Sequence, residues 1–168
     1  MKPTRQVVLV GLAAADWQLF QPLLDKGSMP NLAALLARGV RGRLRTLQPQ
    51  FNPLLWTSIA TGKRAEAHRV LHWESADGDK VHPLSSSALG CQNLWDIVGT
   101  AGGSSLVVNW PVSYPAPALS GVCVSDQFFH FTGTEAALDA PASGGVYPAG
   151  MEAAIAELRL PPSELALE

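Results

Sequence analysis

The sequence predicts an α/β fold with a mainly parallel sheet flanked by helices. Continuous apolar runs rich in β-branched residues are typical of strands that are covered on both faces. Segments whose apolar residues have helical spacing alternate with these runs along the chain. Fifteen glycines and 13 prolines supply the turns between them. Because 168 residues are enough for one domain with a core of its own, we expect residues 1–168 to form a single domain.

The first element is expected to be a buried strand over residues 6–12, followed by a tight turn. Residues 1–15 also imitate a secretory signal, because Lys2 and Arg5 precede an apolar run and three alanines follow it. We favour the strand, since the run is short and a helix begins directly after it. The sequence therefore indicates a cytoplasmic protein. No apolar run reaches the ~20 residues that a membrane-spanning helix needs.

Two helices and a second strand follow. Asp16 is a good cap for a helix that extends to residue 25 and stops at Gly27. Pro30 opens another helix, which Gly39 closes. Residues 40–46 alternate apolar or small side chains with arginines, which predicts a half-exposed strand.

Residues 51–63, FNPLLWTSIATGK, predict a helix that begins where an extended segment ends. Asn52 is a suitable N-cap, and Pro53 fits the first helical position because its missing N–H is not needed there. A helix N-terminus presents unpaired N–H groups and a partial positive charge, so it can bind a phosphoryl group. The side chain at position 52 would face such a group, which makes residue 52 the main candidate for chemistry.

The remainder of the chain continues the alternation of strands and helices. Residues 64–87 and 128–146 are polar or rich in turn residues, and we interpret them as loop insertions, the first with one hairpin. The other expected elements are a helix at 91–101, buried strands at 106–110 and 121–125, a helix at 151–158 and a helix-like end at 163–168.

Composition and spacing exclude several classes of protein. Only 15% of the residues are charged and the net charge is −2, which argues against a nucleic-acid surface. The two cysteines, Cys91 and Cys123, lack the spacing of a zinc site and are interpreted as reduced core thiols. His72, His82 and His130 form no HxxxH pair with one another. Complete phosphate-loop and dinucleotide motifs are both absent.

Five blocks resemble, in order and spacing, the N-terminal half of the type I phosphodiesterase/nucleotide pyrophosphatase family of the alkaline phosphatase superfamily. They are VVLVGLAAADW, SMPNLAALLARGVRGRLRTLQPQ, NPLLWTSIATGKRAEAHRV, VVNWPVSYPA and GVCVSD. The resemblance implies an alkaline-phosphatase-like fold and metal-dependent phosphoester hydrolysis with two divalent metals, usually zinc. In that family an Asp directly after the first strand binds metal, and a Thr or Ser at the helix start is the nucleophile. Further Asp and His ligands come from the second half of the domain.

This chain departs from the family at both of those positions. Ala13 replaces the metal-binding Asp, in GLAAADW where GLDGADW is usual, and Asn52 replaces the nucleophile. A methyl group cannot bind a metal, and a carboxamide cannot be deprotonated at neutral pH. Asp16 matches the family's helix cap and not the missing ligand. His68 matches a loop His that the family follows with Gly-Val; here Arg69 follows it, and a structural role is expected.

Three functions remain open on the sequence alone. The first is the N-terminal piece of a phosphodiesterase-family hydrolase that is inactive as supplied, with no cofactor expected in this chain. The second is a non-catalytic pseudoenzyme that binds a phosphorylated small molecule or a protein. The third is an unrelated α/β nucleotide-binding protein. Because the family's other ligands would lie beyond Glu168, we expect a truncated or derived domain whose sheet edge is covered by a second copy or by a downstream half-domain.

Overall fold

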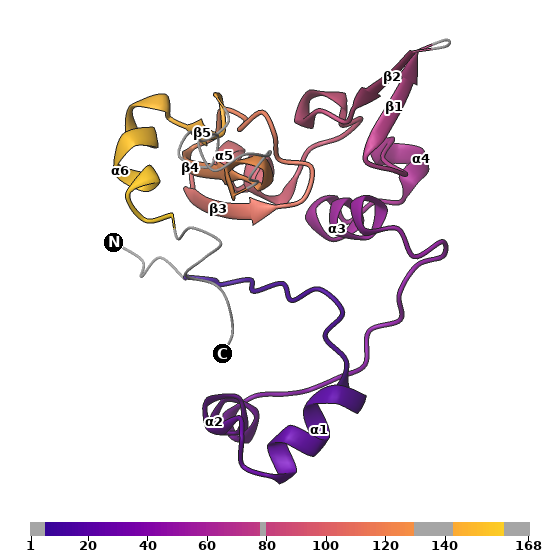
Figure 1. Cartoon of the computed structure of the whole chain (residues 1–168), viewed down its shortest axis with the longest axis vertical. Coiled ribbons are helices and arrows are strands. Elements are labelled where there is room, and N and C mark those ends of the chain that lie inside the picture. Colours follow the sequence, from indigo (N-terminus) through magenta and orange to yellow (C-terminus); the bar gives the residue numbers. More distant parts are fainter. Residues whose placement is uncertain (1–5, 78–79, 130–142, 160–168) are drawn as a thin grey trace, which may run out of the picture. The chain divides into compact units, whose positions relative to one another are not determined.

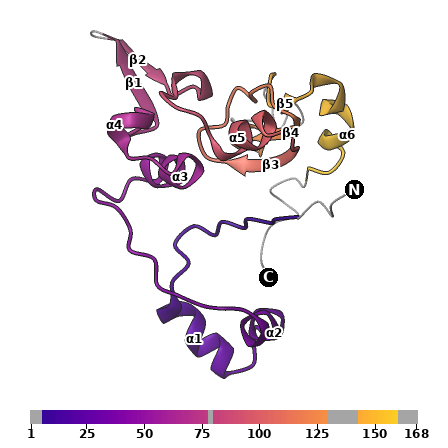
Figure 2. The same ribbon diagram turned by 180° about the vertical axis from the view of Figure 1, so that it is seen from behind.

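The computed structural model of the chain describes residues 6–77, 80–129 and 143–159 (Figure 1; Figure 2). Contacts divide the chain into two compact units, Met1–Arg45 and Thr46–Glu168. The loop insertion expected at 128–146 falls largely outside the described residues, and the helix-like end at 163–168 lies outside them entirely.

The first unit contains two helices that pack against each other, α1 (Trp17–Asp25) and α2 (Pro30–Arg38). Asp16 caps α1 as predicted, because its Oδ1 accepts a hydrogen bond from the N–H of Gln18 at 2.7 Å. Gly27, at φ 73°, follows the end of the helix. Both helices were therefore predictable from their caps and their spacing of apolar residues.

The two strands expected in this part of the chain are not formed. Residues 6–12 and 40–46 belong to no helix or strand, and no strand pairs with them among the described residues. Val7 is 84% exposed and Val40 is 100% exposed. A strand needs a neighbour that satisfies its N–H and C=O groups, and the first unit supplies none. The prediction of a buried first strand was therefore wrong, although the expected turn after it is present, with the N–H of Ala15 bonded to the carbonyl of Leu12.

The second unit contains a three-stranded sheet in the order β3 (Ser105–Trp110), β4 (Gly121–Ser125), β5 (Val146–Tyr147). β3 and β4 are parallel, whereas β4 and β5 are antiparallel. The sheet is therefore mixed and not mainly parallel. The sequence missed β5 because two residues are too few for a recognisable pattern. The strands expected at 106–110 and 121–125 are present, but only β4 is mostly buried, because β3 leaves Leu106 and Val108 exposed.

The core of the second unit joins its helices to this sheet. One buried cluster comprises Ala60 on α3 (Asn52–Thr61), Trp95 on α5 (Leu94–Thr100), Val107 on β3 and Cys123 on β4. Cys123 is a fully buried free thiol, as expected, whereas Cys91 is only half-buried. A series of edge-to-face indole contacts runs through the same region: Trp56 to Trp110 at 5.2 Å between ring centroids, and Trp110 to Trp95 at 6.0 Å. These contacts position α3 against the end of β3.

The hairpin expected in residues 64–87 is present as β1 (Glu74–Asp77) and β2 (Lys80–Pro83). In both views it projects away from the three-stranded sheet, with α3 and α4 at its base (Figure 1; Figure 2). The remaining helices are α3 (Asn52–Thr61), α4 (Ala65–His68), α5 (Leu94–Thr100) and α6 (Glu152–Ala156), with short 3-10 turns at Ser86–Ala88, Asp126–Phe129 and Ala149–Met151. In the part of the chain that the structure describes, no helix has both the length and the apolar character that crossing a membrane requires.

Candidate functional site

The N-terminus of α3 is the first candidate site, because the sequence places residue 52 there. Asn52 is the first helical residue, and Phe51, with extended backbone at φ −95° and ψ 126°, is the N-cap. The prediction that Asn52 caps the helix was therefore off by one residue, and no side chain bonds the first turn. Asn52 is exposed, whereas Pro53 and Leu54 are buried. The helix thus presents the Asn52 side chain to solvent at its positive end.

The start of α3 can bind an anion such as a phosphoryl group, but it has no side chain that could attack phosphorus. The first N–H groups of a helix lack intrahelical partners, so they can donate to an anion. A nucleophile would have to be a hydroxyl, thiol, amine or carboxylate at the same place. The carboxamide of Asn52 offers donors and one acceptor, but its nitrogen lone pair is delocalised into the carbonyl. This end of α3 therefore suits a phosphoryl group as a ligand and lacks the group that would cleave it.

The other candidate position, Ala13, lies in the exposed turn that follows the extended N-terminal segment of the first unit. Its methyl group can neither ligate a metal nor accept a hydrogen bond. The nearest carboxylate in the sequence, Asp16, is occupied by capping α1. Within the described ranges, no group of three or more His, Cys, Asp or Glu side chains could hold a metal ion. Position 13 therefore offers no metal ligand through its side chain.

A histidine next to a serine hydroxyl raises the question of a nucleophile–base pair. His68 Nε2 lies 3.0 Å from Ser58 Oγ, and His68 is fully buried. Its other ring nitrogen, Nδ1, accepts a hydrogen bond from the N–H of Val70 at 3.1 Å. An accepting Nδ1 carries no proton, so in the neutral ring the proton is on Nε2 and Ser58 is the acceptor.

This arrangement prevents His68 from acting as a base toward Ser58, because the nitrogen that faces the hydroxyl already holds its proton. Burial lowers the pKa of His68, and the negative charge of Glu66 opposes that shift. The ring is therefore a neutral connector between α3 and the segment after α4, in agreement with the structural role expected for it. Its contact with Ser58 could not be predicted from the sequence, because the two residues lie on different helices.

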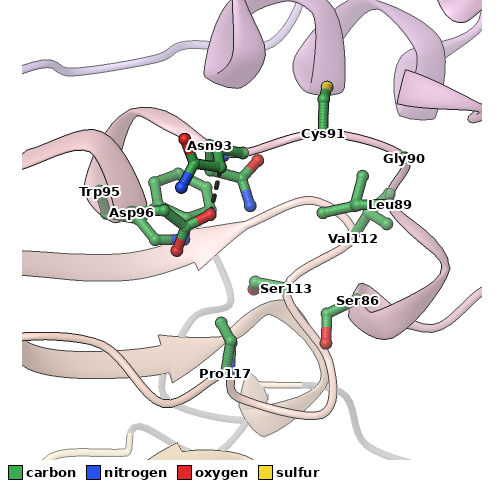
Figure 3. Close-up of a pocket in the computed structure, with 11 residues that line it drawn as sticks. Ser86, Leu89, Gly90, Cys91, Asn93, Trp95, Asp96, Val112, Ser113 and Pro117 are labelled. Atoms are coloured by element: carbon green, nitrogen blue, oxygen red, sulfur yellow. Dashed lines mark hydrogen bonds between the residues drawn. The ribbon is translucent and has the colours of Figure 1, made fainter. Parts of the chain in front are cut away.

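A cavity lies where β3 ends, the edge at which α/β sheets commonly bind ligands (Figure 3). It has a volume of about 340 Å³. Its lining includes the half-buried Cys91, the buried Asn93 and Trp95, and Asp96, whose Oδ2 accepts a hydrogen bond from the N–H of Asn93 at 2.8 Å. Asp96 is the only charged residue in the lining. None of the described residues that line the cavity is basic, so the lining itself offers a phosphoryl group no positive charge.

The wall of the cavity is held by a carboxylate that the sequence analysis did not single out. Asp126, at the end of β4, accepts hydrogen bonds from the N–H of Val112 at 3.0 Å and from Ser113, through its N–H at 3.2 Å and its hydroxyl at 3.3 Å. Val112 has φ 66°, which is unfavourable for a β-branched residue. The buried carboxylate of Asp126 stabilises this backbone, so it holds Val112 and Ser113 in the loop after β3 in one conformation. The signal that could have identified it is an acidic residue directly after a buried strand.

Comparison with known proteins identifies the family of the chain. The family model for type I phosphodiesterase / nucleotide pyrophosphatase matches residues 7–155, and the chain therefore belongs to that family. The matched range contains both position 13 and position 52. No curated protein and no solved structure matches the chain. The resemblance drawn from the five sequence blocks is thus confirmed.

Proposed function

We propose that this chain is the N-terminal part of a phosphoester hydrolase domain that does not itself hydrolyse phosphodiesters. One observation carries the proposal: the exposed first residue of α3, where the family has its nucleophile, is Asn52. Membership of the family suggests descent from a phosphoester hydrolase, whereas the Asn52 side chain at this position cannot act as a nucleophile. The presence of Ala13 where the family has a metal-binding Asp also supports a loss of hydrolysis.

The expected loss of rate is large. In an enzyme whose catalytic groups act as a unit, removal of the nucleophile alone costs on the order of 10⁶ in rate. Hydrolysis by this family needs a hydroxyl oxygen that attacks phosphorus while metal ions stabilise the developing charge. Asn52 offers no such oxygen, and Ala13 offers no metal ligand. The residues present therefore support binding of a substrate-like group and not its cleavage.

A second candidate function is a pseudoenzyme that binds a phosphorylated ligand or a protein partner through the old site. The uncapped start of α3 favours it, because no side chain bonds the N–H groups of the first turn. The exposed Asn52 carboxamide adds two further donors for phosphoryl oxygens. Binding of this kind requires neither a nucleophile nor a metal.

Hydrolysis of a nitrophenyl phosphodiester tests the first proposal. With zinc or manganese added, we expect release of nitrophenol at the rate of the metal alone, and the same rate for an Asn52→Ala control. Turnover well above that rate, abolished in the Asn52→Ala control, would refute the proposal. In the complete domain, Ala13→Asp combined with Asn52→Thr is expected to restore measurable hydrolysis; no gain with the metals bound would contradict the assignment of these two positions.

Titration with inorganic phosphate, followed by amide NMR, tests the second candidate. Shifts are expected at the N–H groups of residues 52 and 54, which begin α3, and not at the interior residue Ser58. An Asn52→Asp variant should weaken the binding, because a carboxylate repels the anion. Absence of shifts at millimolar phosphate would eliminate this candidate while leaving the proposed loss of hydrolysis untouched.

A further inference from the structure

The buried contact between His68, Ser58 and Val70 has a property that the proposed function does not use. Both ring nitrogens of His68 are engaged, one on each side of the ring. The N–H of Val70 needs Nδ1 as an acceptor, so this contact exists only while that nitrogen carries no proton. His68 and Val70 are both 0% exposed, and a water molecule cannot replace the lost partner without local opening.

We propose that His68 is a pH-sensitive latch: protonation of its Nδ1 expels the Val70 N–H and releases the segment that leads from α4 to His72. A proton from solvent binds Nδ1, the ring becomes a double donor, and the Val70 N–H is left facing a donor. The contact to Ser58 can persist, because Nε2 keeps its proton and the hydroxyl still accepts. The change is thus confined to the Val70 side of the ring.

The released segment leads back to the start of α3. The ring of His72 lies against that of Phe51, with 4.3 Å between the ring centroids and an interplanar angle of 43°. Phe51 is the N-cap of α3 and directly precedes Asn52. Arg69, between the latch and Val70, has φ 64°, a backbone conformation that an arginine adopts only when neighbouring contacts hold it. Release at Val70 therefore loosens the ring contact between His72 and Phe51, the residue that directly precedes α3.

The groups around His68 determine in which direction its pKa is shifted. Burial disfavours the charged ring and lowers the pKa of His68, and Glu66 on the same helix is the charge that opposes this effect. α3, which packs against α4, has no ionisable side chain. The N–H of Gly90 donates to the His68 carbonyl at 3.1 Å, and Cys91 is the neighbouring ionisable residue on that segment. Lys63 and Arg64 precede α4, and Arg69 follows it.

The sign follows from proton linkage. In the unfolded state His68 binds a proton when the pH falls below the ordinary histidine pKa of ~6.5. In the folded state the pKa of His68 is lowered, so the ring binds its proton only at a lower pH. The stabilisation is therefore complete above ~6.5 and is lost as the pH falls toward the lowered folded pKa. Across that interval the ratio of folded to unfolded protein decreases by up to about tenfold per pH unit.

Nitrogen NMR of the imidazole rings in the full chain tests the latch directly. At neutral pH we expect Nε2 of His68 to be protonated and Nδ1 not, and the hydrogen-exchange protection of the Val70 amide to decrease as Nδ1 gains its proton. Finding the proton on Nδ1 at neutral pH, or an unchanged Val70 protection while His68 titrates, would overturn the proposal. Both measurements use the unaltered sequence, so they do not depend on any variant that fails to fold.

Three variants test whether His68 itself causes the pH dependence of Val70 protection. His68→Asn keeps an acceptor near the position of Nδ1 but cannot titrate, and is expected to remove the pH dependence of Val70 protection. Glu66→Gln removes the opposing charge and is expected to shift the opening to lower pH. His82→Gln, on the exposed strand β2, is the matched control and should change neither. A Glu66→Gln shift to higher pH, or a loss of pH dependence in the control, would count against the latch.

Discussion

Replacement of Asp126 by Asn should destabilise the second unit more than any other single change of a carboxylate to an amide in the described chain. The carboxylate is 7% exposed and accepts three hydrogen bonds, from Val112 N–H and from the N–H and hydroxyl of Ser113. Val112 and Ser113 are themselves buried, so water cannot take over as the acceptor. In the variant one oxygen is retained, but the new NH₂ group faces a donor.

The magnitude follows from the groups left unpaired. A buried donor without a partner costs about 1–3 kcal/mol, and bonds to a charged acceptor are the stronger ones. The three bonds share one acceptor group and do not add, so we expect a loss of about 3 kcal/mol. The strained φ of Val112 reinforces this, because the same bonds hold its backbone in place. For a chain of this length the melting temperature should fall by roughly 6–12 °C.

Urea denaturation followed by circular dichroism measures the loss, with Asp25→Asn as the control. Asp25 is an exposed carboxylate that accepts one bond from Gln21, and its replacement should change stability by less than about 0.5 kcal/mol. Hydrogen exchange at the Val112 amide should accelerate in Asp126→Asn and not in the control. A loss below about 1 kcal/mol with unchanged Val112 protection would refute the claim that Asp126 fixes this loop.

Three further changes have definite expected outcomes. Arg69→Gly should stabilise the chain by about 0.5–1 kcal/mol in urea denaturation, because glycine adopts the left-handed φ without strain; destabilisation would mean that the arginine side chain matters more than its backbone. Gly90→Ala should destabilise by about 1–3 kcal/mol, since a Cβ there would lie 2.5 Å from the Ala67 carbonyl oxygen. In a thiol-reagent assay near neutral pH, Cys91 should react and Cys123 should not, because burial, followed by the charge of Asp126, raises the pKa of Cys123 to about 11; two equally fast thiols would contradict this.

The sequence predicted those features that depend on local chemistry. The cap of Asp16, the glycine after α1 and the proline that opens α2 are set within a few residues, and all three are present. The strands at 106–110 and 121–125 were also recognisable, because each is a short run rich in apolar and β-branched residues, although Leu106 and Val108 on β3 are exposed.

Features that depend on distant partners could not be predicted in this way. Residues 6–12 have the composition of a buried strand, but whether they become one depends on a neighbour that the run itself does not specify. The same holds for the His68 contacts, since Ser58 lies on a different helix, and for Asp126, which bonds residues 13 and 14 positions away. The assignment of Asn52 to the family's nucleophile position stays a prediction from the spacing of the blocks, whereas the shift of the cap to Phe51 could not be predicted from the sequence.

The edge-to-face arrangement of Trp56, Trp110 and Trp95 gives this protein a built-in optical reporter. The three rings come from α3, β3 and α5, so their mutual orientation, and hence the near-ultraviolet circular dichroism of the coupled indoles, depends on all three elements staying together. A ligand or an acid pulse that tilts α3 would alter this band before any helix melts. The movement of one helix could thus be followed in the unlabelled chain.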